Sequence, residues 1–572
     1  MKEIVLAINI PILVDGSVTY DGNVVLADKN QVIMAIAEER VSKKKYDGQV
    51  TNAVKEILYR NKLTLDDLST ISVVSFGQPM TSSGAMANNL KKYLDSLFPG
   101  FEKIHIVKSH HVAHAMSAVC QTDVKRALVV VADHTGNIIG EITDTKVLEN
   151  NSAEQVSYYL YENNDLKLLA QDNTQPCDQG YGRFYGDVTC YLGFDSYRES
   201  GKTMGLASFG DPAVFSCYPA FTETKTGVVS ELKDENYVYD CTKDIQNWFR
   251  KQGVHIPERR HKAGVIRPFD MHLAAWAQDQ LQKSIINRVK ELINKYHIDT
   301  VCVTGGVAMN SVMNRKLEEE LNINVYVPPS PGDAGLALGA AAEYFWKQDK
   351  KIPKFNSSPY LGPVYSEDEI LESIFSYKNE FVIQKVNDPE YQAARMIANG
   401  KIIGWFQDRS EYGPRALGNR SILASASNSW TKEILNSQIK LREWFRPYAP
   451  VVLEEKADIY FNMLSPVPYM MKVAPVKAQA RLDIPACIHV DGTARLQTVS
   501  ATSNQKFYNL IKELDKITGI PVVLNTSFNL AGMPIVESPV DAINCFRQSI
   551  GMDALFIGNY FLEKNTLFNK NI

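Results

Sequence analysis

Short apolar runs alternate with longer amphipathic stretches along most of the chain. Residues 24–26 and 32–37 are apolar runs joined by a polar turn, which predicts two neighbouring strands. Apolar residues recur at helical spacing over 52–61, 85–97 and 276–296, which predicts three helices. Strands that alternate with helices in this way are typical of a mixed α/β (α/β or α+β) fold.

Three further apolar strands are followed by residues that can carry chemistry. The run at 127–132 leads into Asp133, and a strand-end Asp is a common place to touch phosphate or metal, although an Asx turn is equally compatible. The run at 300–304 enters Gly305 and Gly306, whose N–H groups at a helix start suit an anion or nucleotide. The third run, which begins at Val325, leads to Asp333 in a Pro/Gly loop before an Ala-rich helix.

Three histidines stand within five residues in IHIVKSHHVAHAMSAV, where an apolar strand is predicted to give way to a helix starting at His110. His110 and His114 are four residues apart, so they share one helix face and can bind one cation. His111 points about a quarter-turn away. The sequence therefore predicts a metal site that uses His110 and His114.

The stretch 411–450 concentrates positive charge among apolar, Pro and Gly residues. It opens EYGPRALGNRSIL, closes NSQIKLREWFRPYAP, and holds Arg415, Arg420, Lys440, Arg442 and Arg446. Guanidinium groups near Gly-rich backbone suit a phosphate or another planar anion, and a solvated basic face is the alternative. A helix is predicted from a cap at 428 or 429 to a stop at 447, with Arg446 beyond its end turning back toward Lys440.

Composition and charge narrow the classes of function. The 572-residue chain is too long for one core, its hydrophobic content of 45% is ordinary for a globular protein, and its net charge of -4 draws in neither nucleic acid nor anionic membrane. The eight Cys form no CxxC pair, which favours a reducing, cytoplasmic location over a disulfide scaffold. We interpret the apolar start, MKEIVLAINIPILV, as a buried strand rather than a signal peptide, and no run has membrane-spanning length.

The motifs EYGPRALGNRSILA and IKLREWFRPYAP resemble those of the carbamoyltransferases of natural-product and nodulation-factor biosynthesis. ESGKTMGLASFG, ACIHVDGTARLQTV and PVVLNTSFNLAGMPIVESP match further segments of the same family. The resemblance implies an actin-like ATPase (Kae1-like) carbamoyl-transfer domain at 1–350 and a YrdC-like, adenylate-forming domain at 360–572. We predict that the polar stretch 351–359 links them.

The resemblance assigns roles in the first domain. It adds Asp333 to His110 and His114 as a metal ligand, and two His with one carboxylate suit Fe(II) or Zn(II). The family has a His at the start of the first hairpin as general base, where this chain has Tyr20. It also has Gly after the strand-end Asp, where His134 follows Asp133. We therefore hypothesise that His134 has taken over as the base, since an imidazole would titrate near neutrality; an acceptor that needs no protein base is the alternative.

In the second domain the resemblance implies that ATP, with Mg, and carbamoyl phosphate are co-substrates. The residues expected to hold them and the carbamoyl group are Arg415, Lys440, Arg446, Arg495, Asn525 and Ser527. In the first domain, the residues expected near nucleotide or another anion are Gly305, Gly306, Asn310 and Lys202. A turn at DGT and a capped strand end at NTS are the alternatives for two of these segments.

Together these features predict an ATP-dependent carbamoyltransferase that makes carbamoyl-adenylate and transfers the carbamoyl group to a hydroxyl or amine of a small-molecule acceptor. We expect a monomer or homodimer that binds neither nucleic acid nor membrane. A tRNA threonylcarbamoyl-type enzyme and a non-catalytic actin-like nucleotide-binding protein are the alternatives. A hydrogenase-maturation carbamoyltransferase is disfavoured because its paired CxxC motifs are missing.

Overall fold

The chain divides into two compact units, which are described one at a time. The computed structural model describes residues 3–13, 15–75, 85–139, 152–172, 179–224, 227–232, 241–262, 264–355 and 358–565. Unit 1 comprises Met1–Glu38 and Asp47–Ser357, and unit 2 comprises Glu39–Tyr46 and Ser358–Ile572. The eight residues Glu39–Tyr46 thus lie early in the sequence and belong to the C-terminal unit.

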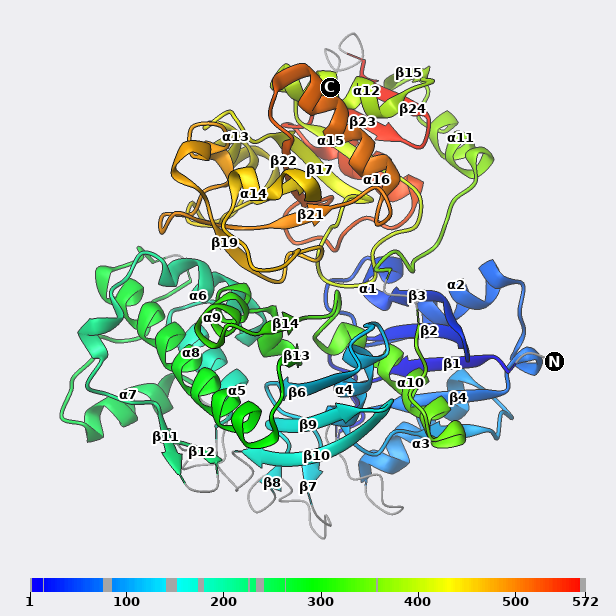
Figure 1. Ribbon diagram of the computed structural model, residues 1–572. Coiled ribbons are helices and arrows are strands. Elements are labelled where there is room, and N and C mark those ends of the chain that lie inside the picture. Colours follow the sequence, from blue (N-terminus) through cyan, green and yellow to red (C-terminus); the bar gives the residue numbers. More distant parts are fainter. Residues whose placement is uncertain are drawn as a thin grey trace. The chain divides into compact units, whose positions relative to one another are not determined.

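Unit 1 contains two five-stranded sheets of the same topology (Figure 1). The first runs β3 (Gln31–Ala37), β2 (Asn23–Asp28), β1 (Val5–Asn9), β4 (Thr70–Val74) and β5 (Ile104–Ile106). The second runs β10 (Asp165–Asp172), β9 (Val156–Glu162), β6 (Arg126–Ala132), β13 (Thr300–Thr304) and β14 (Asn324–Tyr326). In each sheet an antiparallel three-stranded meander continues into two parallel strands. The unit is therefore built from one motif used twice.

Two helices join the sheets of unit 1. Helix α10 (Leu336–Asp349) packs on β1, β2 and β4, helix α4 (His110–Val119) packs on β6 and β13, and the two helices pack on each other (Figure 1). Their approach is close: a Cβ on Gly339 of α10 would lie 1.9 Å from the carbonyl oxygen of Ala113 in α4. Small residues at this crossing therefore position the loop before α10 beside the start of α4.

The remaining elements of unit 1 surround these layers. The helices are α1 (Glu38–Ser42), which begins in this unit, α2 (Thr51–Asn61), α3 (Ala85–Leu97), α5 (Tyr181–Tyr191), α6 (Ser200–Ala207), α7 (Cys241–Lys251), α8 (Pro268–Tyr296) and α9 (Ser311–Leu321). Two short hairpins are β7 (Ile138–Ile139) with β8 (Ser152–Ala153), and β11 (Phe221–Thr224) with β12 (Gly227–Ser230). Among the described residues, no helix is both long and apolar enough to cross a membrane.

Unit 2 is organised around a mixed eight-stranded sheet. Its strands, in spatial order, are β15 (Phe381–Lys385), β24 (Tyr560–Lys564), β23 (Ala554–Ile557), β16 (Ile403–Phe406), β17 (Arg420–Ser425), β22 (Val522–Ser527), β18 (Ala449–Leu453) and β21 (Gln497–Val499). A two-stranded ribbon adds β19 (Val473–Pro475) and β20 (Thr493–Arg495). The helices are α11 (Glu367–Phe375), α12 (Pro389–Ala398), α13 (Thr431–Ile434), α14 (Ala457–Tyr460), α15 (Gln505–Thr518) and α16 (Pro539–Gln548).

Both faces of this sheet are covered by apolar cores. Ile422 and Ala424 point into a core shared with α11 and α16, whereas Leu423 between them points into a core shared with α12 and α15. This alternation follows from the two-residue period of a strand. A central strand buried on both faces reads as a continuous apolar run, which is why the sequence of β17 gives no simple amphipathic signal.

The predicted α/β character is confirmed, with differences in detail. The helices predicted at 52–61 and 85–97 match α2 and α3, but α8 begins at Pro268 rather than at 276, because Pro268 occupies its first turn and Asp270 accepts the N–H of Arg267 at 2.7 Å. Much of the predicted linker is packed: the Lys354 ammonium donates to the carbonyls of Val119 and Thr122.

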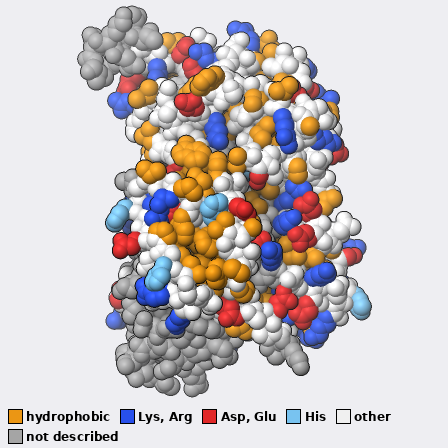
Figure 2. Space-filling view, turned by 90° about the vertical axis from the view of Figure 1, so that its left-hand side faces the viewer, with side chains coloured by type: hydrophobic (Ala, Val, Ile, Leu, Met, Phe, Trp, Pro, Cys, Tyr) orange, Lys and Arg blue, Asp and Glu red, His pale blue; other side chains and the backbone are white. Residues whose placement is uncertain are grey.

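On the face drawn in Figure 2, acidic and basic side chains are interspersed.

Candidate functional site

The histidine cluster of unit 1 lies at the start of α4. Ser109 caps this helix, because its Oγ accepts the backbone N–H of Val112 at 3.1 Å. The cap fixes where the helix begins and hence which face His110 and His114 share. Both side chains are buried, and their Nε2 atoms lie 3.2 Å apart.

Two carboxylates from other strand ends converge on these imidazoles. The Oδ2 atom of Asp133, directly after β6, lies 3.2 Å from Nε2 of both His110 and His114. The Oδ1 atom of Asp333, in the loop before α10, lies 3.3 Å from the same two nitrogens. All four ligand atoms lie within 4.8 Å of one another.

This donor set fits a divalent transition metal. Two imidazole nitrogens and two carboxylate oxygens suit Fe(II) or Zn(II), and two negative charges balance a divalent cation. The two carboxylates and the two imidazoles also stabilise one another's charged forms. Burial disfavours a charged imidazole, but Asp333 and Asp133 outweigh it and raise the pKa of His110 to about 10. Burial acts against the Asp133 carboxylate as well, yet hydrogen bonds from both histidines hold its pKa well below its usual value.

Surrounding residues fix the carboxylates. The N–H of Gly306 donates to Oδ1 of Asp133 at 3.0 Å, which leaves Oδ2 facing the histidines. Gly305 makes this turn possible, because its φ is +87° and a Cβ there would lie 2.3 Å from the carbonyl oxygen of Ala132. Asn23 donates to the backbone carbonyl of Asp333 at 2.9 Å, which ties the first sheet to the ligand loop.

His111 lies off the shared face, as its spacing predicts. Its Nδ1 lies 2.7 Å from Oγ of Ser157, and its backbone N–H points to the Glu154 carboxylate at 3.3 Å. Burial lowers the pKa of His111 to about 4. A neutral imidazole bonded to a strand hydroxyl is a structural residue beside the cluster.

Tyr20 and His134, the two departures from the family pattern, meet at Tyr197. The ring of His134 stacks on Tyr197 with centroids 4.4 Å apart, and Tyr20 meets the same ring edge-on at 6.0 Å. The guanidinium carbon of Arg198 lies 4.2 Å from the centre of the Tyr20 ring. Burial raises the pKa of both tyrosines, and the negative charge of Asp333 adds to the effect.

The surroundings of His134 and Tyr20 do not favour proton uptake by either side chain near neutral pH. Burial, followed by the charge of Arg183, lowers the pKa of His134 to about 4, below the neutral range expected from the sequence. Burial, Tyr197 and Asp333 raise the pKa of Tyr20 well above its ordinary value. His134 is held against the backbone of Gly182, where a Cβ would lie 2.4 Å from the carbonyl oxygen of Asp133.

Other residues predicted to bind ligands in unit 1 have protein partners. Asn310 caps α9 through its Oδ1 and exchanges amide hydrogen bonds with Gln278. Lys202 forms an ion pair with Glu199 at 2.6 Å. Arg260 stands in the basic run 259–262, yet it is buried and donates to the carbonyl oxygens of Leu192 and Gly264.

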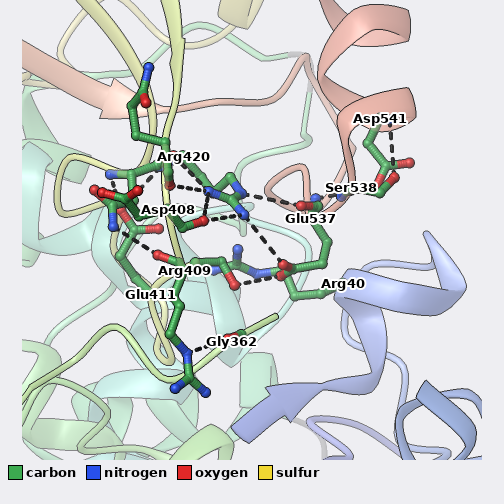
Figure 3. Close-up of polar contacts among 12 residues, drawn as sticks. Arg40, Gly362, Asp408, Arg409, Glu411, Arg420, Glu537, Ser538 and Asp541 are labelled. Atoms are coloured by element: carbon green, nitrogen blue, oxygen red, sulfur yellow. Dashed lines mark hydrogen bonds and ion pairs between the residues drawn. The ribbon is translucent and has the colours of Figure 1, made fainter. Parts of the chain in front are cut away.

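In unit 2 the EYGPRALGNR loop is held by its own glutamate. Oε1 of Glu411 accepts the backbone N–H groups of Leu417, Asn419 and Arg420 at 2.7, 2.8 and 3.2 Å. Arg420 is fully buried and donates to the carbonyls of Gln407 and Asp408, beside Glu537 (Figure 3). Arg420 is thus a structural member of the basic stretch, and Glu411 fixes the backbone of the loop.

The helix predicted after this loop is shorter than expected. One α-helical turn, α13, continues into the π-helical turn η6 (Leu435–Lys440), which ends at Leu441 with a φ of +42° rather than at 447. A residue in the left-handed conformation stops the helix. Arg446 therefore lies beyond the helix end, as predicted, and π-helical turns are frequent at functional sites.

Lys440 closes this turn against β22. Its Nζ donates to the backbone carbonyl of Ser527 at 2.5 Å and to the carbonyl and side-chain oxygens of Asn529 at 2.9 and 2.7 Å. Burial, followed by the charge of Arg442, lowers the pKa of Lys440 well below its ordinary value. Asn525, on the same strand, donates instead to the carbonyl oxygen of Ala416 in the motif loop at 3.1 Å.

Four arginines gather close to Lys440. Burial and the nearby charge of Arg446 lower the pKa of Arg415 to about 10. Burial, then Arg415, Arg442 and Arg446, lower that of Arg495 well below its ordinary value. Among the described residues, Nε of Arg415 and Nε of Arg495 are buried without a hydrogen-bond acceptor. Clustered guanidinium groups that repel one another would be stabilised by a multiply charged anion.

Sequence reasoning missed several members of these two sites. Asp133 was expected to touch phosphate or metal, but its place beside both histidines depends on β6 lying next to β13. Tyr197 lies outside the quoted motifs, and Asn529 lies within PVVLNTSFNLAGMPIVESP without having been singled out; both are found through the residues they contact. Arg442 lies in the same basic stretch as Arg420, and the sequence alone does not show which of the two joins the arginine cluster and which is structural.

Comparisons with known proteins agree with the motifs. The family models for the carbamoyltransferase N-terminus and C-terminus match residues 87–342 and 394–564. Nodulation protein NolNO of Sinorhizobium fredii is 32% identical over 574 residues, covering 96% of this chain and 79% of that protein. Nodulation protein U of the same species is 39% identical over 243 residues, 42% of each chain.

An uncharacterized protein of Methanocaldococcus jannaschii, MJ1051, is 31% identical over 94% of this chain and 97% of its own. Among solved structures, HypF of T. kodakarensis matches with a TM-score of 0.34 and 14% identity, covering 62% of this chain and 49% of that one. The two family models and the full-length relatives establish the identity of the chain: it belongs to the carbamoyltransferase family.

Proposed function

We propose that this carbamoyltransferase makes carbamoyl-adenylate from ATP, with Mg, and carbamoyl phosphate in unit 2, and transfers the carbamoyl group to a hydroxyl or amine of a small molecule in unit 1. The observation that carries the proposal is the arginine cluster around Lys440. These clustered cations repel one another, which lowers their pKa values, and an anion of several charges would stabilise them. ATP and carbamoyl phosphate bound together would provide that negative charge. The duplicated sheet of unit 1 supports an actin-like half, and we assign unit 2 to the YrdC-like class.

The first half-reaction would join carbamate to the adenylyl group of ATP and release phosphate and pyrophosphate. Water cleaves carbamoyl phosphate to carbamate and phosphate. A carbamate oxygen then attacks the α-phosphorus of ATP, the bond to the β-phosphate breaks, and pyrophosphate leaves. Arg415, Arg446 and Arg495 would hold the phosphate oxygens, since a guanidinium can bind two of them at once. Lys440 and Ser527 would orient the carbamoyl group from the end of β22.

In the second half-reaction an acceptor oxygen or nitrogen attacks the carbamoyl carbon and AMP leaves. His110, His114, Asp133 and Asp333 would hold Fe(II) or Zn(II), which supplies Lewis-acid polarisation of the carbamoyl carbonyl. The aromatic group of Tyr20, Tyr197 and His134 would flank the acceptor near the ligand cluster. The imidazole of His134 is one candidate to take the acceptor proton, and an acceptor that needs no protein base is the alternative. The phenol of Tyr20 has a raised pKa and stays protonated, so it would donate a hydrogen bond rather than take the proton.

Pyrophosphate exchange into ATP tests the first half-reaction. Arg446→Ala and Lys440→Ala should each lower carbamoyl-phosphate-dependent exchange at least about tenfold, because a lost contact to a charged oxygen costs about 2–5 kcal/mol. The metal content should stay at the wild-type level. Lys516→Ala is the matched control, because Lys516 lies on the surface of α15, where it pairs with Glu513. Unchanged exchange in both site variants would place adenylate formation elsewhere.

A further inference from the structure

A histidine of unit 2 is not used by the reaction proposed above. His489 stands in the segment ACIHVDGTARLQTV, in the turn that leads into β20. Its backbone N–H donates to the carbonyl of Thr493 at 2.8 Å, and the N–H of Gly492 donates to the carbonyl of His489 at 3.0 Å. These two bonds close the turn and hold His489 next to the first residue of the strand.

The side chain of His489 lies on the same side of β20 as Arg495. Thr493 and Arg495 are two residues apart in this strand, so their side chains point to one face, whereas Ala494 between them belongs to an apolar core. Nδ1 of His489 lies 3.1 Å from Oγ1 of Thr493. The imidazole is therefore attached to the face from which Arg495 projects.

Hydrogen bonds of the next strand connect Arg495 to the rest of the proposed phosphate site. Gln497, two residues after Arg495, donates to the carbonyl of Leu417 at 3.0 Å, in the loop that carries Arg415. Its Oε1 accepts from the side-chain amide of Asn525 at 3.3 Å, at the end of β22. The strand that presents Arg495 is thus bonded to both other segments expected to hold carbamoyl phosphate.

The hydrogen bonds around His489 define which of its nitrogens can accept. The hydroxyl of Thr493 donates its proton to Oδ1 of Asp491 at 2.8 Å, because a carboxylate can only accept. The proton between Thr493 and His489 therefore belongs to Nδ1, which leaves the lone pair of the neutral ring on Nε2. Burial lowers the pKa of His489 to about 4, and the charge of Arg495 acts in the same direction, so the ring stays neutral.

This Nε2 atom is buried, and it has no hydrogen-bond partner in the part of the chain that the structure describes. A buried acceptor without a partner is costly, and a ligand N–H would remove that cost. Carbamoyl phosphate carries an amino group that only one carbon and one oxygen separate from its phosphorus, so neighbouring side chains can hold both ends. In ATP the ribose separates the adenine amino group from the phosphates.

We propose that Nε2 of His489 accepts a hydrogen bond from the amino group of carbamoyl phosphate while Arg495 holds its phosphate. The inference rests on the proposed function and deepens it, because it names a residue that selects a carbamoyl donor over an acetyl donor. Thr493 is a positioning residue that fixes the tautomer. A site built to pair with an N–H group rejects the analogue that lacks it, because its own acceptor is then left unpaired.

Binding of two stable analogues to the full-length protein, measured by isothermal titration calorimetry, tests this inference. Phosphonoacetamide keeps the amino group, and acetonylphosphonate has a methyl group in its place. The wild type should bind phosphonoacetamide about tenfold more tightly. His489→Phe should remove the preference by weakening phosphonoacetamide alone, whereas His489→Gln, whose Oε1 can accept, should keep most of it. His255→Phe, at an exposed histidine of unit 1, is the matched control and should keep the full preference.

Three results would overturn the inference: a wild type that does not prefer phosphonoacetamide, a preference that persists in His489→Phe, or an equal loss of both analogues in that variant. Thr493→Val should lower the preference without affecting acetonylphosphonate, and it decides the question if His489→Phe melts below the wild type; an unchanged preference in Thr493→Val would then count against the inference. Failure of the proposed function shows separately, as absent pyrophosphate exchange in a wild type that still prefers phosphonoacetamide.

Discussion

The Oδ2 atom of Asp133 lies 3.2 Å from Nε2 of His114, and both groups are buried. Asp133 ends a strand of the second sheet, whereas His114 is on the helix that packs between the sheets. A carboxylate held at this distance by a backbone N–H on its other oxygen is oriented before any ligand arrives. Asp133 is therefore positioned to act as a fourth ligand of the proposed metal site, in line with the phosphate or metal contact that its place at a strand end predicts.

Asp133→Asn should lower bound iron or zinc about as much as Asp333→Asn, by tenfold or more in affinity, because each removes one negative ligand from a four-group set. Pyrophosphate exchange should survive in both variants, because the proposed adenylation site lies in unit 2. Metal analysis of purified protein, with and without a chelator, measures the first effect. Wild-type metal content in Asp133→Asn would exclude it as a ligand.

His111→Ala should keep the metal and lose stability. The change removes a buried imidazole and leaves Oγ of Ser157 without its 2.7 Å partner, which costs about 1–3 kcal/mol in the free energy of unfolding. Chemical denaturation measures the loss, and metal analysis serves as its control. Loss of metal comparable to that in His114→Ala would show that His111 is a ligand too.

Anion binding in unit 2 should take up a proton. Burial and Arg442 hold the pKa of free Lys440 well below its ordinary value of 10.5, and a bound polyphosphate stabilises the ammonium and raises it again. Between these two pKa values the complex holds more protons than the free protein, so affinity falls as pH rises through that range. Calorimetry in buffers of different ionisation enthalpy measures the uptake, and it should vanish in Lys440→Met. Uptake that persists unchanged in that variant would assign the proton to another group.

Transfer by Tyr20→Phe and His134→Ala separates the possible routes of the acceptor proton. A base that accepts this proton contributes about 10²–10⁴-fold, so loss of that size in one variant, with pyrophosphate exchange intact, identifies it. The low pKa of His134 and its stacking on Tyr197 favour a smaller, positioning effect. Near-wild-type carbamoyl transfer in both variants, followed by mass spectrometry, would favour an acceptor that needs no protein base.

Glu411→Ala should loosen the loop that carries Arg415. Three backbone N–H groups lose their acceptor, which predicts a loss of about 2–4 kcal/mol in the free energy of unfolding if the loop cannot rearrange. Tripolyphosphate affinity should fall with it, whereas metal content in unit 1 should not change. An unaltered melting temperature and affinity would mean that other contacts hold the loop.

The sequence alone determined the features that depend on local spacing. The i, i+4 spacing of His110 and His114 placed both on one helix face, and the apolar runs predicted β2 and β3 and the helices α2, α3 and most of α8. Gly305 was recognisable because a strand that enters a helix through paired glycines needs a tight turn. The motifs within 411–450 were sufficient to identify the family resemblance, since they combine charged residues with Pro and Gly at fixed spacing.

Only the tertiary structure decided what depends on contacts between distant segments. Asp133 and Asp333 are 200 positions apart and meet because β6 pairs with β13 and α10 packs on α4. The assignment of Glu39–Tyr46 to unit 2 has no signal in composition, because Arg40 and Lys43 look like a solvated charge run until their partners at Gly413 and Asp541 are known. The spacing of residues in the sequence determines which side chains share one face of a helix. Strand pairing and contacts between distant residues determine which of these faces pack together in the fold.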